Sequence, residues 1–171
     1  MTDGIICIDT ETTGLSEKDE ILQLAIINGS NEVLFYDHFK PQYVKSWPKA
    51  QSIHGISPAM VENKRSIEFH RQRIQKIIQN SKIIIGYNLV KFDLRFLKRA
   101  GITVPEIPVY DVMLEFADIY GEWHSYYENN KWQKLVTCAK YYGYPNLDNL
   151  HDSLEDVKAT LYCYRCMNNK K

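Results

Sequence analysis

The chain has 171 residues, of which 44% are hydrophobic and 12% aromatic, and its 21 basic side chains balance 21 acidic ones. This length and composition predict one soluble globular domain, residues 1–171, and no apolar run reaches the roughly 20 residues needed to cross a membrane. Zero net charge excludes a protein that coats nucleic acid through a general positive field, although local cations or metal ions can still hold phosphates.

The N-terminal residues and the cysteines bear on the cellular location. Residues 1–4 lead into a strand-like segment without a basic or cleavable signal region, which predicts a cytoplasmic protein. The four cysteines are irregularly spaced, and we interpret them as reduced thiols. Cys163 and Cys166 form a C-x-x-C pair, but a structural zinc ion usually takes four ligands and no second pair lies nearby in the sequence.

The first part of the chain has the pattern of an antiparallel meander. Residues 4–9 (GIICID) are typical of a buried strand, and residues 20–28 and 32–39 predict two more. Residues 28–31 (NGSN) are a hairpin signal, because Asn and Gly tolerate positive φ. Residues 40–58 contain several prolines and no sustained period, which predicts an irregular loop.

The rest of the chain alternates strands with helices. Residues 66–80 place isoleucines at helical spacing behind a candidate N-cap, Ser66. Residues 82–86 predict a short buried strand, and residues 92–100 predict a helix that ends at Gly101. A meander followed by this alternation predicts an α/β domain built on a mixed sheet. The pattern continues with a strand at 107–111 and helices at 111–120, 132–142 and 152–167.

Two carboxylates stand where the first strand ends, in the stretch ICIDTETTGL. Asp9 and Glu11 are two residues apart, so both side chains point to the same face of a continuing strand. Two like charges raise each other's pKa unless a cation lies between them, and Mg²⁺ and Mn²⁺ prefer oxygen ligands. Asp9 alone would fit a solvated strand terminator, but the pair favours a metal site.

Two later segments contain further candidate ligands. Asp93 follows a predicted strand and begins the next helix, where a single acid also fits the helix dipole. Asp152 and Glu155 fit a capping box that places Asp156 in the first turn of the last helix. His151 precedes that helix and is free to fold back toward Asp156.

The four acids and one histidine match two-metal phosphoryl chemistry. In such sites a pair of ions roughly 4 Å apart holds the phosphate, activates the attacking water and stabilises the leaving oxygen. Histidine as a residue type can exchange a proton near neutral pH, so His151 is a candidate general base that deprotonates this water.

Three ordered motifs, D-x-E-T-T-G-L, N-x(3)-F-D and H-x(4)-D, resemble those of the DEDDh (DnaQ-like) 3′-to-5′ exonucleases and spread over most of the chain. The resemblance implies an RNase H-like fold, a mixed five-stranded sheet of a three-strand antiparallel meander plus parallel strands, flanked by helices. It also implies two divalent cations, Mg²⁺ or Mn²⁺, as cofactors. The implied catalytic residues are the metal ligands Asp9, Glu11, Asp93 and Asp156, and the general base His151.

The same resemblance implies contacts with the terminal nucleotide. Gly14 would let the backbone approach it closely, Leu15 would wedge against a base, and Phe92 would stack on one. Core packing explains Leu15 and Phe92 equally well. His54, in the segment SIHGIS, is similar to a His-Gly-Ile element of many members and would touch the 3′ nucleotide. The candidate set is Thr10, Thr12, Gly14, Leu15, His54, Asn88 and Phe92.

One position departs from the family pattern. The second strand reads Ile21-Leu22-Gln23-Leu24-Ala25, with glutamine where bacterial proofreading subunits often have glutamate. No auxiliary acid is therefore expected at Gln23.

The resemblance leads us to expect release of 5′-mononucleotides from the 3′ end of single-stranded nucleic acid. The D-T-E-T-T-G-L form resembles proofreading domains, such as the epsilon subunits of bacterial DNA polymerase III, and this favours DNA over RNA and suggests a polymerase partner. A 3′-to-5′ exoribonuclease and a noncatalytic RNase H-like nucleic-acid-binding module are the alternatives. A haloacid-dehalogenase-like phosphatase needs aspartate where Glu11 stands. The tyrosine-rich stretch from Tyr110 to Tyr144 could enclose a substrate strand or simply pack.

Overall fold

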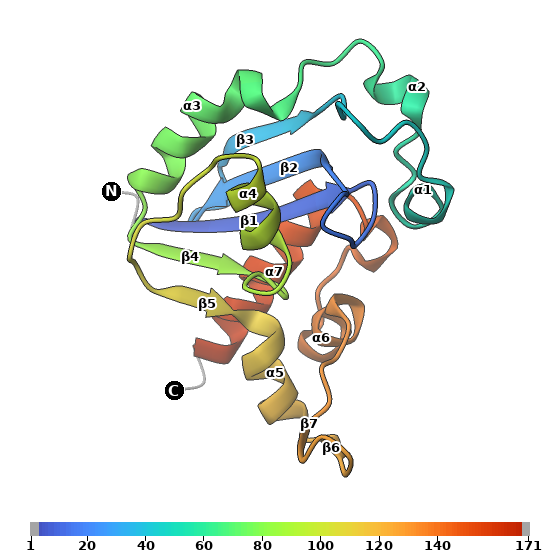
Figure 1. Ribbon diagram of the computed structural model, residues 1–171. Coiled ribbons are helices and arrows are strands. Elements are labelled where there is room, and N and C mark those ends of the chain that lie inside the picture. Colours follow the sequence, from blue (N-terminus) through green and yellow to red (C-terminus); the bar gives the residue numbers. More distant parts are fainter. Residues whose placement is uncertain (1–3, 169–171) are drawn as a thin grey trace.

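A five-stranded mixed sheet forms the centre of the computed structural model, which describes residues 4–168 (Figure 1). Its spatial order is β3-β2-β1-β4-β5; β1, β2 and β3 pair antiparallel, and β4 and β5 run parallel to β1. This confirms the predicted RNase H-like meander plus parallel strands. The strands are β1 (Ile5–Thr12), β2 (Ile21–Asn28), β3 (Val33–His38), β4 (Ile83–Gly86) and β5 (Val109–Asp111), with a separate ribbon of β6 (Trp123–His124) and β7 (Asn129–Asn130).

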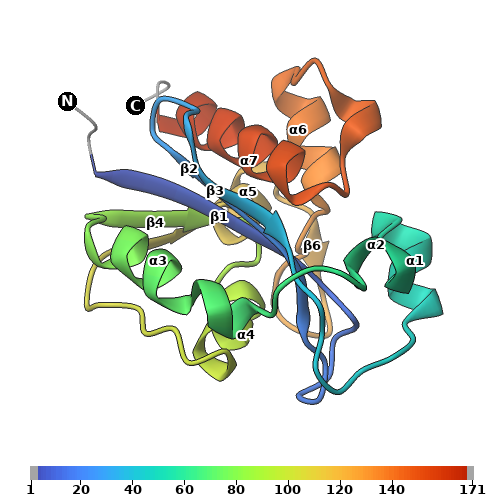
Figure 2. The ribbon, with the colours of Figure 1, turned by 90° about the horizontal axis from the view of Figure 1, so that it is seen from above.

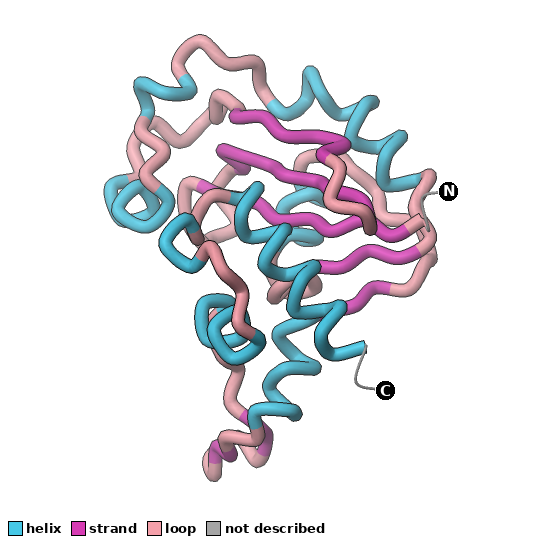
Figure 3. The backbone as a smooth tube through the Cα atoms, turned by 180° about the vertical axis from the view of Figure 1, so that it is seen from behind, coloured by secondary structure: helices cyan, strands magenta, loops and turns pink. Residues whose placement is uncertain are grey.

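Helices cover both faces of the sheet, α3 and α4 on one side and α5, α6 and α7 on the other (Figure 2). Figure 3 shows α7 crossing the second face. Two short helices, α1 and α2, lie beyond the end of β1 (Figure 1). The helices are α1 (Pro48–His54), α2 (Pro58–Val61), α3 (Ile67–Gln79), α4 (Asp93–Arg99), α5 (Val112–Tyr120), α6 (Leu135–Tyr142) and α7 (Ser153–Asn168), with a 3₁₀ turn at Leu147–Asn149.

The central strand β1 contributes to two separate cores. Ile6 and Ile8 belong to the apolar cluster shared with α3 and α4, whereas Cys7 belongs to the cluster shared with α5, α6 and α7. Because side chains alternate along a strand, Asp9 and Glu11 continue the face of Cys7, and Thr10 continues the face of Ile8. This alternation decides which helix each polar side chain can meet.

The segment 40–58 is not the irregular loop expected from its prolines. It contains α1, and α2 begins at its end, with Pro48 and Pro58 in the first helical turns. Proline is favoured there, because the first helical N–H groups have no partner within the helix. The indole N–H of Trp47 donates to the carbonyl of Ile56 (2.7 Å), and this closes a small core under α1 and α2.

Other element boundaries differ in smaller ways. β1 continues beyond Asp9 to Thr12 because it stays paired with β2, and α6 begins at Leu135 rather than at residue 132. The β6–β7 hairpin and the 3₁₀ turn are too short to leave a periodic pattern, and neither was predicted. Gly101 has a φ of +74° directly after α4, as expected of a helix-ending glycine.

All four cysteines are free thiols, which confirms the interpretation of the sequence. Within residues 4–168, no helix has the length and apolar character that spanning a membrane requires. Residues 1–3 and 169–171 lie outside the described part of the chain. The predictions of a missing signal region and of a domain that spans residues 1–171 depend partly on them.

Candidate active site

Three of the predicted metal ligands converge at the C-terminal part of β1. Asp9 and Glu11 come from β1 and Asp156 from the first turn of α7, and one carboxylate oxygen of each lies within 4.8 Å of the others. The two-residue spacing on the strand brings Asp9 and Glu11 to the face that α7 covers. A donor set made only of carboxylate oxygens suits a hard divalent cation.

Burial and mutual repulsion of the charged carboxylates in this cluster destabilise the folded protein when no metal ion is bound. Burial raises the pKa of Asp9 well above its usual range, and the charges of Asp93 and Asp156 raise it further. Burial likewise raises the pKa of Glu11 to about 9 and that of Asp156 to about 7, with neighbouring carboxylates adding to both. A bound cation would offset this repulsion, so the residues present fit a divalent metal ion.

Asp93 approaches the cluster from the other face of the sheet. It is the first residue of α4, and it accepts a hydrogen bond from the hydroxyl of Thr10 (2.6 Å). Burial raises the pKa of Asp93 to about 7, although this hydrogen bond acts in the opposite direction. Asp93 is not part of the compact three-carboxylate group. The structure thus brings three of the four predicted ligands together. The fourth, Asp93, lies outside this group and is hydrogen-bonded to Thr10.

His151 lies directly before α7 in a left-handed backbone conformation. Its φ is +82°, and its backbone N–H donates to Oδ1 of Asp156 (3.1 Å). The side chain of His151 is exposed. The pKa of His54 is lowered by burial and, to a smaller degree, by the charge of His151, so the two imidazoles are within electrostatic reach. The backbone N–H of His151 therefore orients the predicted metal ligand Asp156. Proton transfer to the imidazole ring of His151 stays a prediction.

Gln23 ties the beginning of α7 to the sheet. It pairs with Glu11 across β1 and β2, and its side chain is 1% exposed. Its Oε1 accepts the backbone N–H of Ser153 (3.0 Å), and its Nε2 donates to Oδ2 of Asp152 (3.2 Å). The hydroxyl of Tyr36, on β3, donates to the same oxygen (2.8 Å). The departure from the family pattern at Gln23 therefore corresponds to a support for the helix that carries Asp156.

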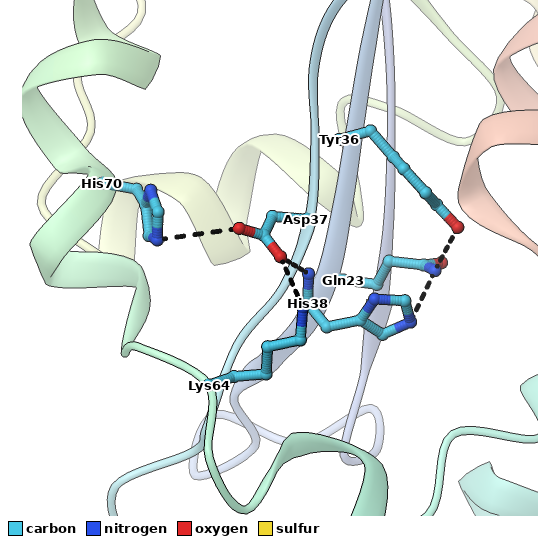
Figure 4. A network of polar contacts seen from close by, with 6 residues as sticks. All are labelled: Gln23, Tyr36, Asp37, His38, Lys64 and His70. Carbon is cyan, nitrogen blue, oxygen red and sulfur yellow. Dashed lines mark hydrogen bonds and ion pairs between the residues drawn. The ribbon is translucent and has the colours of Figure 1, made fainter.

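The Gln23 network continues along β3 to α3 (Figure 4). The amide Nε2 of Gln23 lies 2.9 Å from Nε2 of His38, which must accept, because the amide nitrogen has only hydrogens to offer. This requires a neutral ring, and burial, followed by the charge of Lys64, lowers the pKa of His38. Asp37 binds Lys64 (3.1 Å) and lies 3.9 Å from a ring nitrogen of His70.

The predicted capping box of α7 is only half present. Oδ1 of Asp152 accepts the backbone N–H of Leu154 (3.0 Å), as an N-cap residue should. Glu155 does not complete the box, since its carboxylate accepts from the hydroxyl of Tyr144 and from Nζ of Lys158. Contacts with Tyr144, just after α6, and with Lys158, three residues further along α7, therefore replace the capping contact that the sequence pattern predicts.

A groove of about 600 Å³ adjoins the acidic cluster. Glu11, Leu15, His54 and Phe92 line it, together with residues of α1. Leu15 is 84% exposed, so core packing does not explain it. Phe92 is half-buried and packs on Phe96, with ring centroids 4.9 Å apart, so it belongs both to the core and to the groove. These positions are compatible with the predicted base contacts.

The remaining predicted substrate contacts already have partners in the protein. The Thr10 hydroxyl binds Asp93, and that of Thr12 donates to the carbonyl of Gly14 (2.7 Å). A Cβ atom on Gly14 would lie 2.7 Å from a carboxylate oxygen of Asp19, so packing within the loop requires glycine there. Contacts of these residues with a nucleotide stay predictions.

His54 and Asn88 also make local backbone contacts. Nε2 of His54 lies 3.1 Å from the carbonyl of Thr12, and its Nδ1 accepts the N–H of Ile56 (3.0 Å), which joins α1 to the end of β1. Asn88 has a φ of +58°, and its N–H donates to Oδ1 of Asp111 (2.9 Å). For both residues the predicted nucleotide contact remains untested.

Asp111 is a supporting residue that was not predicted from the sequence. Its carboxylate accepts the backbone N–H groups of Asn88, Val90 and Met113, so it caps α5 and fixes the segment that leads to Asp93. An acid between a strand and a helix is a recognisable N-cap signal, but the contact with residues 88–90 depends on the pairing of β4 with β5.

Comparison with known families identifies the class of this protein. The family model RNase_T, described as Exonuclease, matches residues 6–164. The chain therefore belongs to this exonuclease family, the DnaQ-like nucleases, as its motifs predict.

Two related proteins are similar in sequence. The chain is 27% identical to the uncharacterized exonuclease CP81 of Escherichia phage 186 over 172 residues, which covers 94% of this chain and 86% of that protein. It is 35% identical over 97 residues to a PolC-type DNA polymerase III of Thermotoga petrophila, covering 54% of this chain and 7% of the polymerase.

Two solved structures show the same fold. The zinc-bound complex of Escherichia coli ExoI with single-stranded DNA superposes with a TM-score of 0.80 at 22% identity, covering 98% of this chain and 40% of that one. Exonuclease X in complex with 5′-overhanging duplex DNA gives a TM-score of 0.67 at 22% identity, covering 98% of this chain and 92% of that one. The chain thus spans less than half the length of the ExoI chain.

Proposed function

We propose that this protein is a metal-dependent 3′-to-5′ exonuclease that removes 5′-mononucleotides from the 3′ end of single-stranded DNA. The observation that carries the proposal is the convergence of Asp9, Glu11 and Asp156 beside an open groove and next to His151. Family membership supports nucleic-acid hydrolysis as the reaction, and the acidic cluster supports this end of β1 as the place where it occurs.

The proposed roles follow from the positions of the side chains. Asp9, Glu11, Asp93 and Asp156 would hold two Mg²⁺ or Mn²⁺ ions, which in such sites activate the attacking water and stabilise the charge on the phosphate. The exposed ring of His151 would take the proton from the attacking water. As the water oxygen bonds to phosphorus, the bond to the 3′ oxygen breaks, which leaves a 3′-hydroxyl on the shortened strand and a 5′-phosphate on the released nucleotide.

The groove would hold the terminal nucleotide. Leu15 projects into solvent at its mouth and Phe92 forms part of its wall, so the two could contact the faces of a base without hydrogen bonds specific to one sequence. His54 and the Thr12 to Gly14 turn shape the wall between them.

The preference for DNA rests on resemblance. The similar structures of ExoI and Exonuclease X contain single-stranded and overhanging DNA, and the partial match to a PolC-type polymerase supports a role in proofreading or repair beside a DNA polymerase. An exoribonuclease would have the same acidic cluster. The noncatalytic alternative is disfavoured because all five predicted catalytic groups are present. A cytoplasmic location remains a prediction.

Digestion of end-labelled strands tests the proposal. Purified protein with Mg²⁺ or Mn²⁺ should shorten a 5′-labelled single strand to a ladder and release 5′-mononucleotides, faster for DNA than for RNA, and EDTA should stop the reaction. The Asp9→Asn variant is the matched control. Intact DNA and RNA in the presence of either metal would exclude the enzyme, and faster RNA digestion would identify the exoribonuclease.

A further inference from the structure

The β6–β7 hairpin exposes aromatic side chains that the proposed chemistry does not use. Trp123 is 60% exposed, Tyr126 82%, Tyr127 66% and Trp132 49%. Exposed aromatic side chains that lie close together form a candidate binding surface, because burial of each ring against a ligand is favourable. We refer to these four residues as the aromatic platform.

Of the other tyrosines in the same stretch, Tyr120 on α5 and Tyr141 on α6 are 42% and 52% exposed, and three pack inside the domain. Tyr144 is buried, Tyr142 and Tyr110 are half-buried, and all three belong to the apolar core that includes α6 and α7. The tyrosine-rich stretch therefore includes a part that packs inside the domain, exposed rings on α5 and α6, and a part that projects from the domain at β6 and β7 (Figure 1).

A groove connects the aromatic platform with the segment that carries Asp93. Lys91, His124, Tyr127 and Trp132 are among the residues that line this groove of about 670 Å³. Lys91 stands two residues before Asp93, a separation of at most roughly 7 Å along the backbone. The hydroxyl of Tyr87 also donates to the carbonyl of Gln133 (2.8 Å), which fastens the hairpin to the segment after β4.

The groove combines stacking surfaces with a cation. Nζ of Lys91 lies 4.0 Å from the centroid of the Trp132 ring, and Lys91 is exposed. The ring centroids of His124 and Tyr127 are 4.7 Å apart. Rings and a cation are what successive bases and a phosphate would meet.

The charges around the groove favour stacking over electrostatic binding. Lys131 is paired with Glu122 (2.7 Å), and Asp118 accepts from the side chain of Asn130. Among the described residues that line the groove, Lys91 is the one lysine outside an ion pair, so the platform would bind a single strand through its bases and with a weak dependence on salt.

We propose that the aromatic platform binds the substrate strand upstream of its 3′ end, so that strands long enough to reach it bind more tightly than short ones. This inference rests on the proposed function and adds a second nucleic-acid site to it. A single-stranded nucleic acid is the favoured occupant, because the groove begins next to the catalytic segment and offers both rings and a cation.

Binding to oligo-dT strands of two lengths tests the proposal. In the inactive full-length Asp156→Asn background, we expect Trp132→Ala to weaken binding of a fluorescent 16-mer by about 10-fold, within the range of stacking on one base. Binding of a 4-mer should change less than about twofold, and Trp132→Phe should recover most of the affinity for the 16-mer. Tyr127→Ala should behave like Trp132→Ala.

Phe69→Ala is the matched control, since Phe69 on α3 is 66% exposed, as Tyr127 is, but lies far from the hairpin. The proposal is wrong if Trp132→Ala does not weaken binding of the 16-mer, which is the result expected of a hairpin that binds a protein instead. It is also wrong if Trp132→Ala weakens binding of the 4-mer and the 16-mer equally, or if Phe69→Ala weakens binding of the 16-mer as much as Trp132→Ala does. Length-dependent binding by a wild-type protein that cleaves nothing would support the platform and refute the proposed function. Cleavage by a wild-type protein whose binding does not depend on strand length would support the proposed function and refute the platform.

Discussion

The two halves of the acidic cluster are held in different ways. Asp9 and Glu11 lie two residues apart on β1, and the pleat of the strand alone directs both to one face. Asp156 and His151 lie at the start of α7, and Gln23, Tyr36 and Asp152 fasten this helix to β2 and β3. The positions of Asp9 and Glu11 therefore follow from the local geometry of one strand. The position of Asp156 depends on contacts between residues more than 100 positions apart in the sequence.

Because of this difference, we expect the two halves of the acidic cluster to respond differently to mutations. A strand in the middle of a sheet keeps its side-chain directions unless the whole sheet unfolds, so only loss of a carboxylate itself should damage the β1 half. The first turn of a helix can shift as a unit when its anchors are lost. The α7 half should therefore be sensitive to residues that touch neither metal nor substrate.

The largest expected effect is common to both halves. Asp9→Asn and Asp156→Asn should each reduce kcat on a single-stranded substrate by on the order of 10³-fold, because a lost ligand removes several kcal/mol of transition-state stabilisation. Cleavage rates at saturating Mn²⁺ measure this, with thermal unfolding as the check on folding. Near-normal activity of either variant would remove that residue from the metal site.

The second prediction separates the two halves. Gln23→Leu should lower kcat about 10- to 100-fold while KM changes little, as expected when a residue that orients a ligand is lost. Gln75→Leu is the control, because Oε1 of Gln75 on α3 likewise accepts a backbone N–H, that of Thr103 (2.8 Å), away from the site. If the kcat of Gln23→Leu were the same as that of Gln75→Leu, the contacts of Gln23 with α7 would not be required for activity.

The third prediction concerns stability without metal. In EDTA, Glu11→Gln should unfold a few degrees higher than the wild type, since about 1 kcal/mol of relieved repulsion shifts Tm by roughly 2–4 °C in a chain of this size. Added Mn²⁺ should reverse the order by stabilising the wild type more. A lower Tm of Glu11→Gln in EDTA would mean that the carboxylates do not strain the bare protein.

The smallest expected effect is a pH dependence at the far end of the Gln23 network. Burial lowers the pKa of His38 in the folded state, so its contribution to stability is present above the unfolded pKa of about 6.5 and is lost as the pH falls below that value. The wild-type Tm should therefore drop more between pH 7.5 and 5.5 than that of His38→Gln. Parallel curves for the two proteins would show that His38 is not held neutral.

Much of the site follows from short stretches of sequence because its signals are local. The spacing of Asp9 and Glu11 predicts a shared face, and a histidine five residues before Asp156 predicts a group at the start of a helix. The prolines between residues 40 and 58 led to a wrong prediction of an irregular loop, because proline breaks the interior of a helix but is favoured in its first turn. Very short elements such as β6 and β7 leave no period to detect.

The sequence by itself determined the class of the protein, the mixed sheet and the identity of the five proposed catalytic residues, because these depend on side-chain periodicity and motif spacing along one chain. The tertiary structure alone decided which carboxylates meet. It joined Asp93 to Thr10, made Gln23 an anchor for α7, and exposed the aromatic platform while other parts of the tyrosine-rich stretch pack inside the domain. Each of these depends on the face that a side chain presents to a distant element, which no local pattern records.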